Sequence, residues 1–261
     1  MFDLKNKIIV LTGAAGGLGS AIAYELSTAG AILIMVDRNN DALEHLNQQL
    51  GGQHHCLTVD LSDDTQRQQL VSFCSDLPDG IDMLINNAGI SDFSLLANTT
   101  GSRIETVISV NLISPIQLCN ALLPLLDAKT AAMIVNVGST FGSIGFPGFS
   151  VYASSKFGMR GFTESLRREL ADTSISVKYF APRAAKTAIN NDNVVAMNTE
   201  LGNKMDTPAE VASQFIQFIQ SRHHSYYVGW PEKLFVKINS LLPSLVDKSI
   251  LKQLPIIKRY L

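Results

Sequence analysis

Short apolar runs rich in Val, Ile and Leu alternate with helix-forming stretches along most of this chain. The first run, KIIVL, occupies Lys7–Leu11, the second, ILIMV, occupies Ile32–Val36, and a helical stretch at Gly17–Ala29 separates them. Runs without polar alternation are typical of strands buried on both faces, as in parallel sheets. Because parallel neighbours require a crossover connection, the alternation predicts one parallel sheet with helices on both faces. The length of 261 residues fits a single domain of this α/β class.

The rest of the chain continues this pattern. Further strands are expected at His55–Val59, Met83–Ile85, Met133–Val137, Ser176–Phe180 and Tyr226–Val228, which gives about seven strands in all. Further helices are expected at Asn40–Leu50, Thr100–Leu126, Tyr152–Ala171 and Pro208–Ser221, with an irregularity at Pro115. Ser62 or Asp63 fits the cap of one more helix after the third strand. No repeat or low-complexity linker marks a domain boundary before residue 222.

Composition narrows the function classes. Hydrophobic residues make up 46% of the chain and charged residues 17%, which supplies a core and argues against disorder. The net charge of −2 gives no reason to expect nucleic acid as a partner. The N-terminus lacks a signal-peptide pattern, and we expect no membrane-spanning helix because no apolar stretch of about 18 residues is free of charge. A cytoplasmic location is therefore expected.

Cysteine and histidine positions do not predict a metal site. Cys56, Cys74 and Cys119 lie outside metal-ligand spacing, and we expect them to be idle thiols in a reducing compartment. The pairs His54-His55 and His223-His224 fall in expected surface segments with no further ligand near them.

The segment Thr12-Gly13-Ala14-Ala15-Gly16-Gly17-Leu18-Gly19 follows the first strand and opens the first helix. A helix N-terminus offers unpaired N–H groups and a positive dipole end, which suit a pyrophosphate. Glycines allow the tight turn and the close approach of the backbone to a ligand. A lone glycine-rich segment is a weak signal, but its place between strand and helix predicts a dinucleotide site.

The second strand ends in Asp37, 18 residues after Gly19. An acidic side chain at this place can accept hydrogen bonds from adenosine ribose hydroxyls and would repel a 2′-phosphate, so NAD(H) is favoured. Arg38 could pair with that phosphate, which keeps NADP(H) open. The alternative role of Asp37 is to cap the next helix. Asp60, at the end of the third strand, would lie near the adenine, and it too has a helix-cap alternative.

Tyr152 and Lys156 stand four residues apart on an expected helix, hence on one face. A nearby ammonium is expected to lower the pKa of the phenol, which makes Tyr152 a usable proton donor or acceptor for an alcohol–carbonyl pair. By itself such a pair is common on helix surfaces. Ser139, which follows the fifth strand, and Asn111, a polar residue in the middle of a long apolar helix, strengthen the prediction of a chemical site.

Together these motifs resemble the short-chain dehydrogenase/reductase family in its common single-domain form, with an atypical C-terminal tail. The resemblance covers residues 7 to about 190. It implies a Rossmann-like doubly wound parallel sheet and an NAD(P)(H)-dependent oxidoreductase acting on CH–OH groups. The matching elements are Thr12–Gly19, Asp60, Asn86–Gly89, Asn111, Ser139, Tyr152, Lys156 and the segment from Pro182 to Thr187.

The resemblance also implies a role for each residue. Tyr152 would be the general acid/base, Lys156 would hold the nicotinamide ribose, Ser139 would bind the substrate oxygen, and Asn111 would anchor a water in a proton relay. The cofactor cleft would be formed by Gly13, Ala15, Gly17, Leu18, Gly19, Asp37, Arg38, Asp60, Leu61, Asn87, Ala88, Gly89, Tyr152, Lys156, Pro182 and Thr187.

Two departures from the family pattern bear on the substrate. The family usually has Pro-Gly after the sixth strand, whereas this chain has Pro182-Arg183. Arg183 would either contact the cofactor or a polar part of the substrate, or else point into solvent. The second departure is at the C-terminus. Residues 1–231 are expected to form the dinucleotide-binding and catalytic domain, and residues 232–261 are expected to form an amphipathic extension of it.

In that extension, apolar residues fall on one helical face, and Pro243 and Pro255 are expected to divide it into short helices. Lys233–Leu261 carries six basic residues and one acidic residue. The extension would pack as a lid or rest on a membrane surface. Either role would suit a substrate that is a hydrophobic or lipid-like alcohol or ketone. The apolar residues on that face are Leu234, Phe235, Ile238, Leu241 and Leu242.

Other function classes stay open at this point. The same fold could serve as a non-catalytic dinucleotide-binding redox sensor or a membrane-surface protein, because fold does not fix function. The complete acid/base set argues for an enzyme. Helices at Ser102–Leu126 and Tyr152–Ala171 would form a homodimer face.

Overall fold

The computed structural model describes residues 2–261 and contains a seven-stranded, entirely parallel sheet in the order β3-β2-β1-β4-β5-β6-β7. Strands β2 and β3 are added to one side of β1, and the chain then crosses back so that β4 to β7 are added in order to its other side. The point of return leaves a crevice at the carboxyl ends of β1 and β4. The strands are β1 Ile8–Thr12, β2 Ile32–Asp37, β3 His55–Thr58, β4 Met83–Asn86, β5 Ala132–Val137, β6 Ile175–Ala181 and β7 Ser225–Tyr227.

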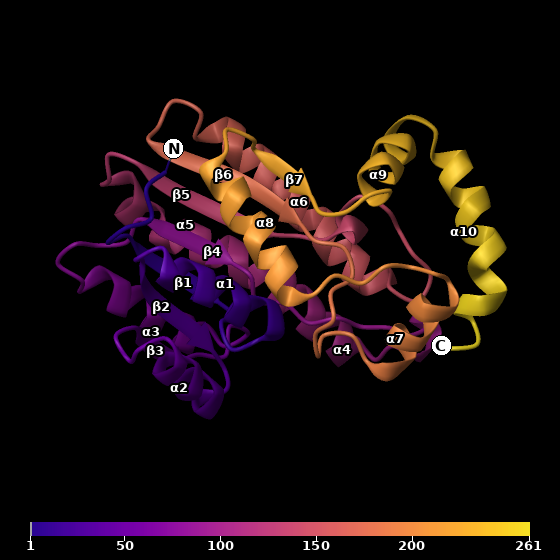
Figure 1. Ribbon diagram of the computed structural model, residues 1–261, viewed down its shortest axis with the longest axis horizontal. Coiled ribbons are helices and arrows are strands. Elements are labelled where there is room, and N and C mark those ends of the chain that lie inside the picture. Colours follow the sequence, from indigo (N-terminus) through magenta and orange to yellow (C-terminus); the bar gives the residue numbers. More distant parts are fainter. Residues whose placement is uncertain (1) are drawn as a thin grey trace.

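Helices cover both faces of this sheet (Figure 1). Residues of α1 (Gly17–Thr28), α2 (Asn40–Gln49) and α8 (Pro208–Gln220) share one apolar core with the strands. Residues of α3 (Asp64–Ser75), α5 (Ser114–Asp127) and α6 (Ser150–Glu169) share a second core on the opposite face. The expected doubly wound α/β fold is confirmed, and each expected strand lies within a residue or two of its predicted bounds.

One long helix from Gly101 to Asp127 joins β4 to β5, and it is irregular in the turn before Pro115, as expected near this proline. The irregularity is a π-helical turn at Ser109–Ile113 between α4 (Gly101–Ile108) and α5, and it contains Asn111, whose carbonyl lies four residues before Pro115 and cannot receive an N–H from it. By length and composition this helix could span a membrane, because residues 106–126 include no charged side chain, contrary to the expectation from the sequence. Its apolar side packs in the core through Leu118, Leu122 and Leu126.

Two regions beyond β6 were predicted poorly. Helix α7 (Asp192–Glu200) lies in the excursion between β6 and α8 and was not predicted. The extension forms α9 (Glu232–Leu241) and α10 (Pro243–Ile257), which arch at the end of the molecule away from β2 and β3 (Figure 1). Pro243 separates the two helices as expected, but Pro255 does not end a helix. It lies exposed in the last turn of α10, where water can satisfy the carbonyl that loses its N–H partner.

His54, Cys74 and Cys119 are buried in the structure. The surface position expected for His54 is wrong: it is 6% exposed, its Nδ1 accepts from the Leu33 N–H at 3.3 Å, and its Nε2 lies 2.8 Å from the Ser27 hydroxyl. Burial raises the pKa of Cys74 and of Cys119 to about 12 each, which keeps both as thiols. Within residues 2–261 no three His, Cys, Asp or Glu side chains form a metal-sized cluster.

Two short 3-10 turns complete the description, η1 at Leu96–Asn98 and η3 at Thr140–Gly142. Both follow strands at the carboxyl edge of the sheet, the first after β4 and the second after β5. The second of them places Thr140 and Phe141 at the crevice between the two halves of the sheet.

Candidate functional site

A cavity of about 760 Å³ runs along the carboxyl edge of the sheet, from the ends of β2 and β3 to the ends of β5 and β6. All but two of the residues expected from the sequence line it. Ala15 and Asn111 are the two that do not line it. The residues that line it are Gly13, Gly17, Leu18, Gly19, Asp37, Arg38, Asp60, Leu61, Asn87, Ala88, Gly89, Ser139, Tyr152, Lys156, Pro182, Arg183 and Thr187.

The glycine-rich loop forms a cradle that side chains would fill. No side chain caps the N-terminus of α1. A Cβ on Gly19 would lie 2.0 Å from the carbonyl oxygen of Gly13, and one on Gly17 would lie 2.8 Å from Cγ2 of Thr187. Gly13 itself has a φ of 64°, which other residues rarely adopt. An uncapped helix end lined by backbone fits the pyrophosphate of a dinucleotide.

Asp37 is anchored beside that loop. One carboxylate oxygen accepts from the Ala15 N–H at 3.1 Å and the other from the Asn39 N–H at 3.2 Å. The helix-cap alternative is excluded because Asn39, not Asp37, caps α2 through the Ala42 N–H. Asp37 therefore presents a fixed negative charge at the cavity wall.

Asp60 is likewise not a helix cap, since Asp63 caps α3. Its Oδ1 accepts from the backbone N–H of Ser62 at 2.9 Å and from the Ser62 hydroxyl at 2.7 Å. These bonds hold the pKa of Asp60 below its usual value. Asp60 is thus an ionised group at the same end of the cavity as Asp37.

Asn87 fastens the two halves of the sheet at the crevice. Its Nδ2 donates to the carbonyl oxygens of Thr12 and Gly13 at 3.0 and 3.1 Å. The backbone N–H groups of Asn87 and Ala88 donate to the Thr12 hydroxyl, each at 3.0 Å. These bonds fix the glycine-rich loop relative to the end of β4.

Tyr152 and Lys156 share one wall of the cavity on α6. Nζ of Lys156 donates to the Val137 carbonyl at 3.0 Å and lies 5.8 Å from the centre of the Tyr152 ring. Lys156 is 4% exposed. A Cβ on Gly89 would lie 3.4 Å from that Nζ and 3.3 Å from Oδ1 of Asn111, so a glycine lets these three segments approach closely.

Asn111 stands in the π-helical turn and binds the loop after Gly89. Its Oδ1 accepts from the Ile90 N–H at 2.8 Å, and its Nδ2 donates to the Ile90 carbonyl at 2.9 Å and to the Ser155 hydroxyl at 3.0 Å. The buried amide thus serves a network and coincides with a helix irregularity, a combination typical of functional sites.

The expected effect of Lys156 on the Tyr152 pKa is wrong for this arrangement. Burial raises the pKa of Tyr152 to about 12, and the side-chain contact with Ser139 opposes this rise only in part. Burial lowers the pKa of Lys156 to about 8. Removing each group from water disfavours its charged form, and this outweighs the effect of a neighbour whose ammonium is held by a backbone carbonyl. At neutral pH Tyr152 is a phenol and therefore a proton donor.

Tyr179 supports Ser139 and was not found from the sequence. The Tyr179 hydroxyl donates to the Ser139 carbonyl at 3.3 Å and accepts from the Ser139 N–H at 3.4 Å. A Cβ on Gly138 or Gly142 would lie 2.1 or 2.3 Å from this hydroxyl. The two glycines that flank Ser139 are thus the sequence signal for a buried side chain packed against the loop.

The far end of the cavity is apolar. Phe141 and Phe146 stack with their centroids 5.3 Å apart, and Phe149 packs edge-on to Tyr152 at 6.2 Å. Val194 and Met197 of the unpredicted helix α7 complete this wall. Substrate-pocket residues of this kind could not be found from the sequence because their place depends on how α7 folds back.

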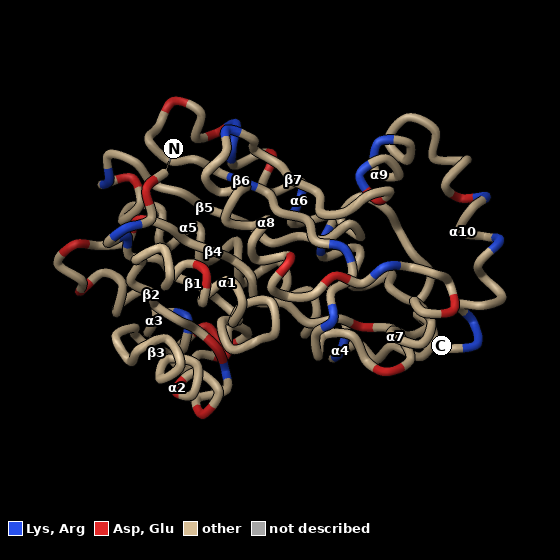
Figure 2. The backbone as a smooth tube through the Cα atoms, in the orientation of Figure 1, with Lys and Arg blue, Asp and Glu red and all other residues tan. Residues whose placement is uncertain are grey.

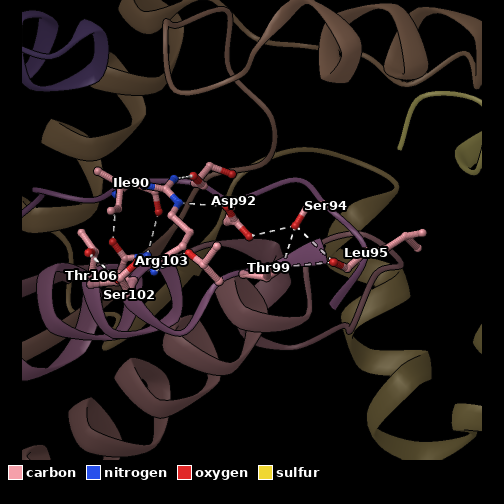
Figure 3. A network of polar contacts seen from close by, with 11 residues as sticks. Ile90, Asp92, Ser94, Leu95, Thr99, Ser102, Arg103 and Thr106 are labelled. Carbon is pink, nitrogen blue, oxygen red and sulfur yellow. Dashed lines mark hydrogen bonds and ion pairs between the residues drawn. The ribbon is translucent and has the colours of Figure 1, made fainter. Parts of the chain in front are cut away.

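The loop between β4 and α4 forms the opposite rim, and Arg103 holds it in place (Figure 3). Nε of Arg103 donates to Asp92 at 2.9 Å, and Nη2 donates to the Ser91 carbonyl. Farther along, the hydroxyls of Ser94 and Thr99 lie 2.7 Å apart. These bonds give the rim a defined shape next to the apolar wall.

Arg183 does not point into solvent, so that alternative is wrong. Its guanidinium donates to both carboxylate oxygens of Asp206, at 2.6 and 2.7 Å, and to Glu232 at 3.0 Å. The side chain reaches the cavity wall, but three of its N–H groups are already bound to carboxylates. Its pKa is raised, first of all by the bond to Asp206. Arg183 ties the end of β6 to the start of α8 and to the extension.

Comparison with known proteins agrees with this geometry. The sequence profile of the short chain dehydrogenase family matches residues 7–198. The chain is 31% identical to the 3-oxoacyl-(acyl-carrier-protein) reductase FabG of Vibrio harveyi over 232 residues, which are 87% of this chain and 95% of that protein.

Solved structures agree in fold. A short chain dehydrogenase/reductase from Burkholderia phymatum in complex with NAD superposes with a TM-score of 0.83 at 22% identity, covering 94% of this chain and 96% of that one. A short chain dehydrogenase from Burkholderia cenocepacia in complex with NADP superposes with a TM-score of 0.82 at 19% identity, covering 96% of this chain and 99% of that one. Both likenesses show the fold.

Proposed function

Because the chain belongs to the short-chain dehydrogenase/reductase family, we propose that it interconverts an alcohol and a ketone or aldehyde with a nicotinamide cofactor. The observation that carries this proposal is that Ser139, Tyr152 and Lys156 share one cavity with the glycine-rich loop. A binding protein without catalysis has no need for a buried acid/base pair beside a dinucleotide cradle.

The residues fit the cofactor. Gly13, Gly17 and Gly19 form the cradle for the pyrophosphate, Asp37 stands where the adenosine ribose hydroxyls would bind, and Asp60 stands beside them. The negative charge of Asp37 favours NAD(H) over NADP(H), because the latter would place a phosphate against a carboxylate. Arg38, exposed at the same wall, is the residue that would accommodate NADP(H). The relatives bind one or the other cofactor, as their descriptions state.

A bound nicotinamide supplies or accepts the hydride, and the protein manages the oxygen and its proton. In the reductive direction the Ser139 hydroxyl donates a hydrogen bond to the substrate carbonyl oxygen. Tyr152 donates its phenolic proton to that oxygen as the carbon is reduced, and the reverse transfer accompanies oxidation. The pKa of about 12 keeps Tyr152 protonated at neutral pH, which suits the donor role in the reductive direction.

Lys156 and Asn111 assist this chemistry. We assign to Lys156 the role of binding the hydroxyls of the nicotinamide ribose, because its ammonium is buried in the wall between Gly89 and Tyr152. The side-chain amide of Asn111 is bound to Ile90 and Ser155, so we assign it a positioning role in place of a side-chain water anchor. It holds the loop after Gly89 against Lys156.

We further propose a hydrophobic or lipid-like substrate. Three phenylalanines with Val194 and Met197 surround the space next to Tyr152, which an apolar chain or ring fits better than a sugar. The likeness to a reductase of 3-oxoacyl groups supports the same class of substrate and the reductive direction.

We also propose a homodimer. Ile113 and Phe157, on the helices expected to form the dimer face, are each 44% exposed although both are large and apolar. We propose in addition that residues 232–261 are an extension of a single domain formed by residues 1–231, of which Met1 lies outside the described part of the chain.

The test is the decay of NADH or NADPH fluorescence with a panel of aldehydes and ketones of increasing chain length. Turnover that improves with apolar length and is lost in Tyr152→Phe supports the proposal. Cofactor binding without turnover across the panel would instead identify a redox sensor.

A further inference from the structure

Large apolar side chains are exposed along the segment that ends the chain. Leu241 is 79% exposed and Trp230 is 69% exposed. Single exposed apolar residues are common on proteins, but a group of them in one segment marks a contact surface. The members of this group are Trp230, Leu234, Phe235, Leu241, Leu242, Leu245 and Leu251, here called the tail patch.

The tail patch is not the face by which the extension packs on the domain. Val236, Val246 and Ile257 are the buried residues of α9 and α10. Nδ2 of Asn239 donates to the Ser143 carbonyl at 2.9 Å, and Tyr260 donates to Glu200 at 2.7 Å. The helices are therefore docked by one side while the tail patch faces outward.

Of the two roles expected for the apolar face of the extension, a packed lid or a membrane contact, the exposure of these side chains favours the second. Leu234, Phe235, Leu241 and Leu242 were expected on one helical face, and each is at least 39% exposed. Val236, which lies off that face, takes the buried position in α9.

Basic residues surround the tail patch. Six Lys and Arg and one Asp lie between Lys233 and Leu261, and Figure 2 shows blue segments on both helices and at the C-terminal turn. On α10, Leu245, Lys248 and Leu251 follow one another at intervals of three, and Lys252 lies one turn beyond Lys248, all exposed. Leucines and lysines thus share the outward face.

Exposed apolar side chains also lie in two segments that help to line the cavity. Leu95 and Leu96 are 43% and 60% exposed in the loop after β4, and Ile189 and Val195 are 42% and 40% exposed next to and in α7. Ile257 and Leu261 pack in the same apolar cluster as Phe149 and Tyr152. The segment that carries the tail patch thus also contributes Ile257 and Leu261 to the apolar cluster at the end of the cavity.

We propose that the tail patch binds the surface of an anionic lipid bilayer, with α9 and α10 in the headgroup layer and the apolar end of the cavity next to the lipid. Leucines between lysines suit this partner, because acyl chains receive the former and anionic headgroups the latter. A protein partner is disfavoured, since lysine is depleted in protein interfaces. Trp230 is suited to the headgroup depth.

Trp230 is the only tryptophan in the chain, so its fluorescence reports directly on this surface. The full-length protein is titrated with vesicles of equimolar phosphatidylglycerol and phosphatidylcholine, and with vesicles of phosphatidylcholine alone. We expect a blue shift and co-sedimentation with the anionic vesicles, at least about tenfold weaker binding to the neutral ones, and loss of binding in high salt.

Two variants separate the contributions. Lys248→Glu with Lys252→Glu should weaken binding to anionic vesicles at least about tenfold. Leu241→Ser with Leu245→Ser and Leu251→Ser should abolish the blue shift, and because these side chains are exposed the fold should remain intact. The matched control is Lys5→Glu with Arg222→Glu, two exposed residues at the amino edge of the sheet, which should bind like the wild type.

Absence of binding to anionic vesicles, or equal binding by the control and the Lys248/Lys252 variant, would overturn the proposal. So would concentration-dependent dimers that the three leucine substitutions disperse, because the patch would then contact a second copy of the chain. None of these readouts depends on turnover, so failure here leaves the proposed dehydrogenase activity untouched.

Discussion

Arg183 donates to both carboxylate oxygens of Asp206, from Nε at 2.7 Å and from Nη2 at 2.6 Å. Their side chains are only 8% and 6% exposed. The pair closes the base of the excursion that carries α7, and a third bond, to Glu232, adds the first turn of α9. A residue at the usual place of a glycine thus connects the substrate side of the cavity with the extension.

Arg183→Gly should lower the free energy of unfolding by about 3–5 kcal/mol, because Asp206 would be left as an unpaired buried charge. Urea unfolding measures this loss. The control Arg222→Gly removes an exposed arginine and should change stability by less than about 0.5 kcal/mol. Equal stability of the two variants would show that the pair contributes nothing.

The fold was largely predictable because strand and helix signals alternate and each apolar run has the length of one buried strand. The site followed, since the carboxyl ends of parallel strands meet at one edge and bring Gly13, Asp37, Asn87 and Ser139 together. By contrast, α7 and the pairing of Arg183 depend on contacts between segments far apart in sequence. The direction of the apolar face of α9 was left open because periodicity shows that an apolar face exists but not whether it turns toward the core or toward solvent.

Asp37→Ala should reduce kcat/KM for NADH at least about tenfold and raise it for NADPH, because the carboxylate that binds ribose hydroxyls and repels a 2′-phosphate is removed. The ratio of kcat/KM values for the two cofactors is the measurement. Asp41→Ala, an exposed acid in the first turn of α2, serves as the control. An unchanged ratio in Asp37→Ala would contradict the assignment of the ribose site.

Gly19→Ala should abolish NADH binding, since the added Cβ would lie 2.0 Å from the Gly13 carbonyl oxygen and force the loop apart. Titration of protein fluorescence with NADH measures the affinity. Gly161→Ala is the matched control, because nothing lies within 4 Å of its added Cβ on α6. Undiminished affinity in Gly19→Ala would show that the loop does not hold the cofactor.

The activity should depend on pH through Lys156. Burial lowers its pKa to about 8, so the ammonium is present below that pH and is lost as the pH rises through it. The kcat/KM for NADH should therefore fall above about pH 8. In Lys156→Arg, which keeps its charge, the residual activity should not fall in this range. A profile that is flat to pH 10 in the wild type would contradict the role of the ammonium.

The most direct test of the account is transfer of deuterium from NADH labelled at the nicotinamide C4 into the alcohol formed from an apolar ketone, followed by mass spectrometry. Labelled alcohol is predicted for the wild type. In Tyr152→Phe, which still binds NADH, its formation should slow by about 10²–10⁴-fold, the usual contribution of a general acid. Equal label transfer by both proteins would contradict the assignment of Tyr152 as the proton donor.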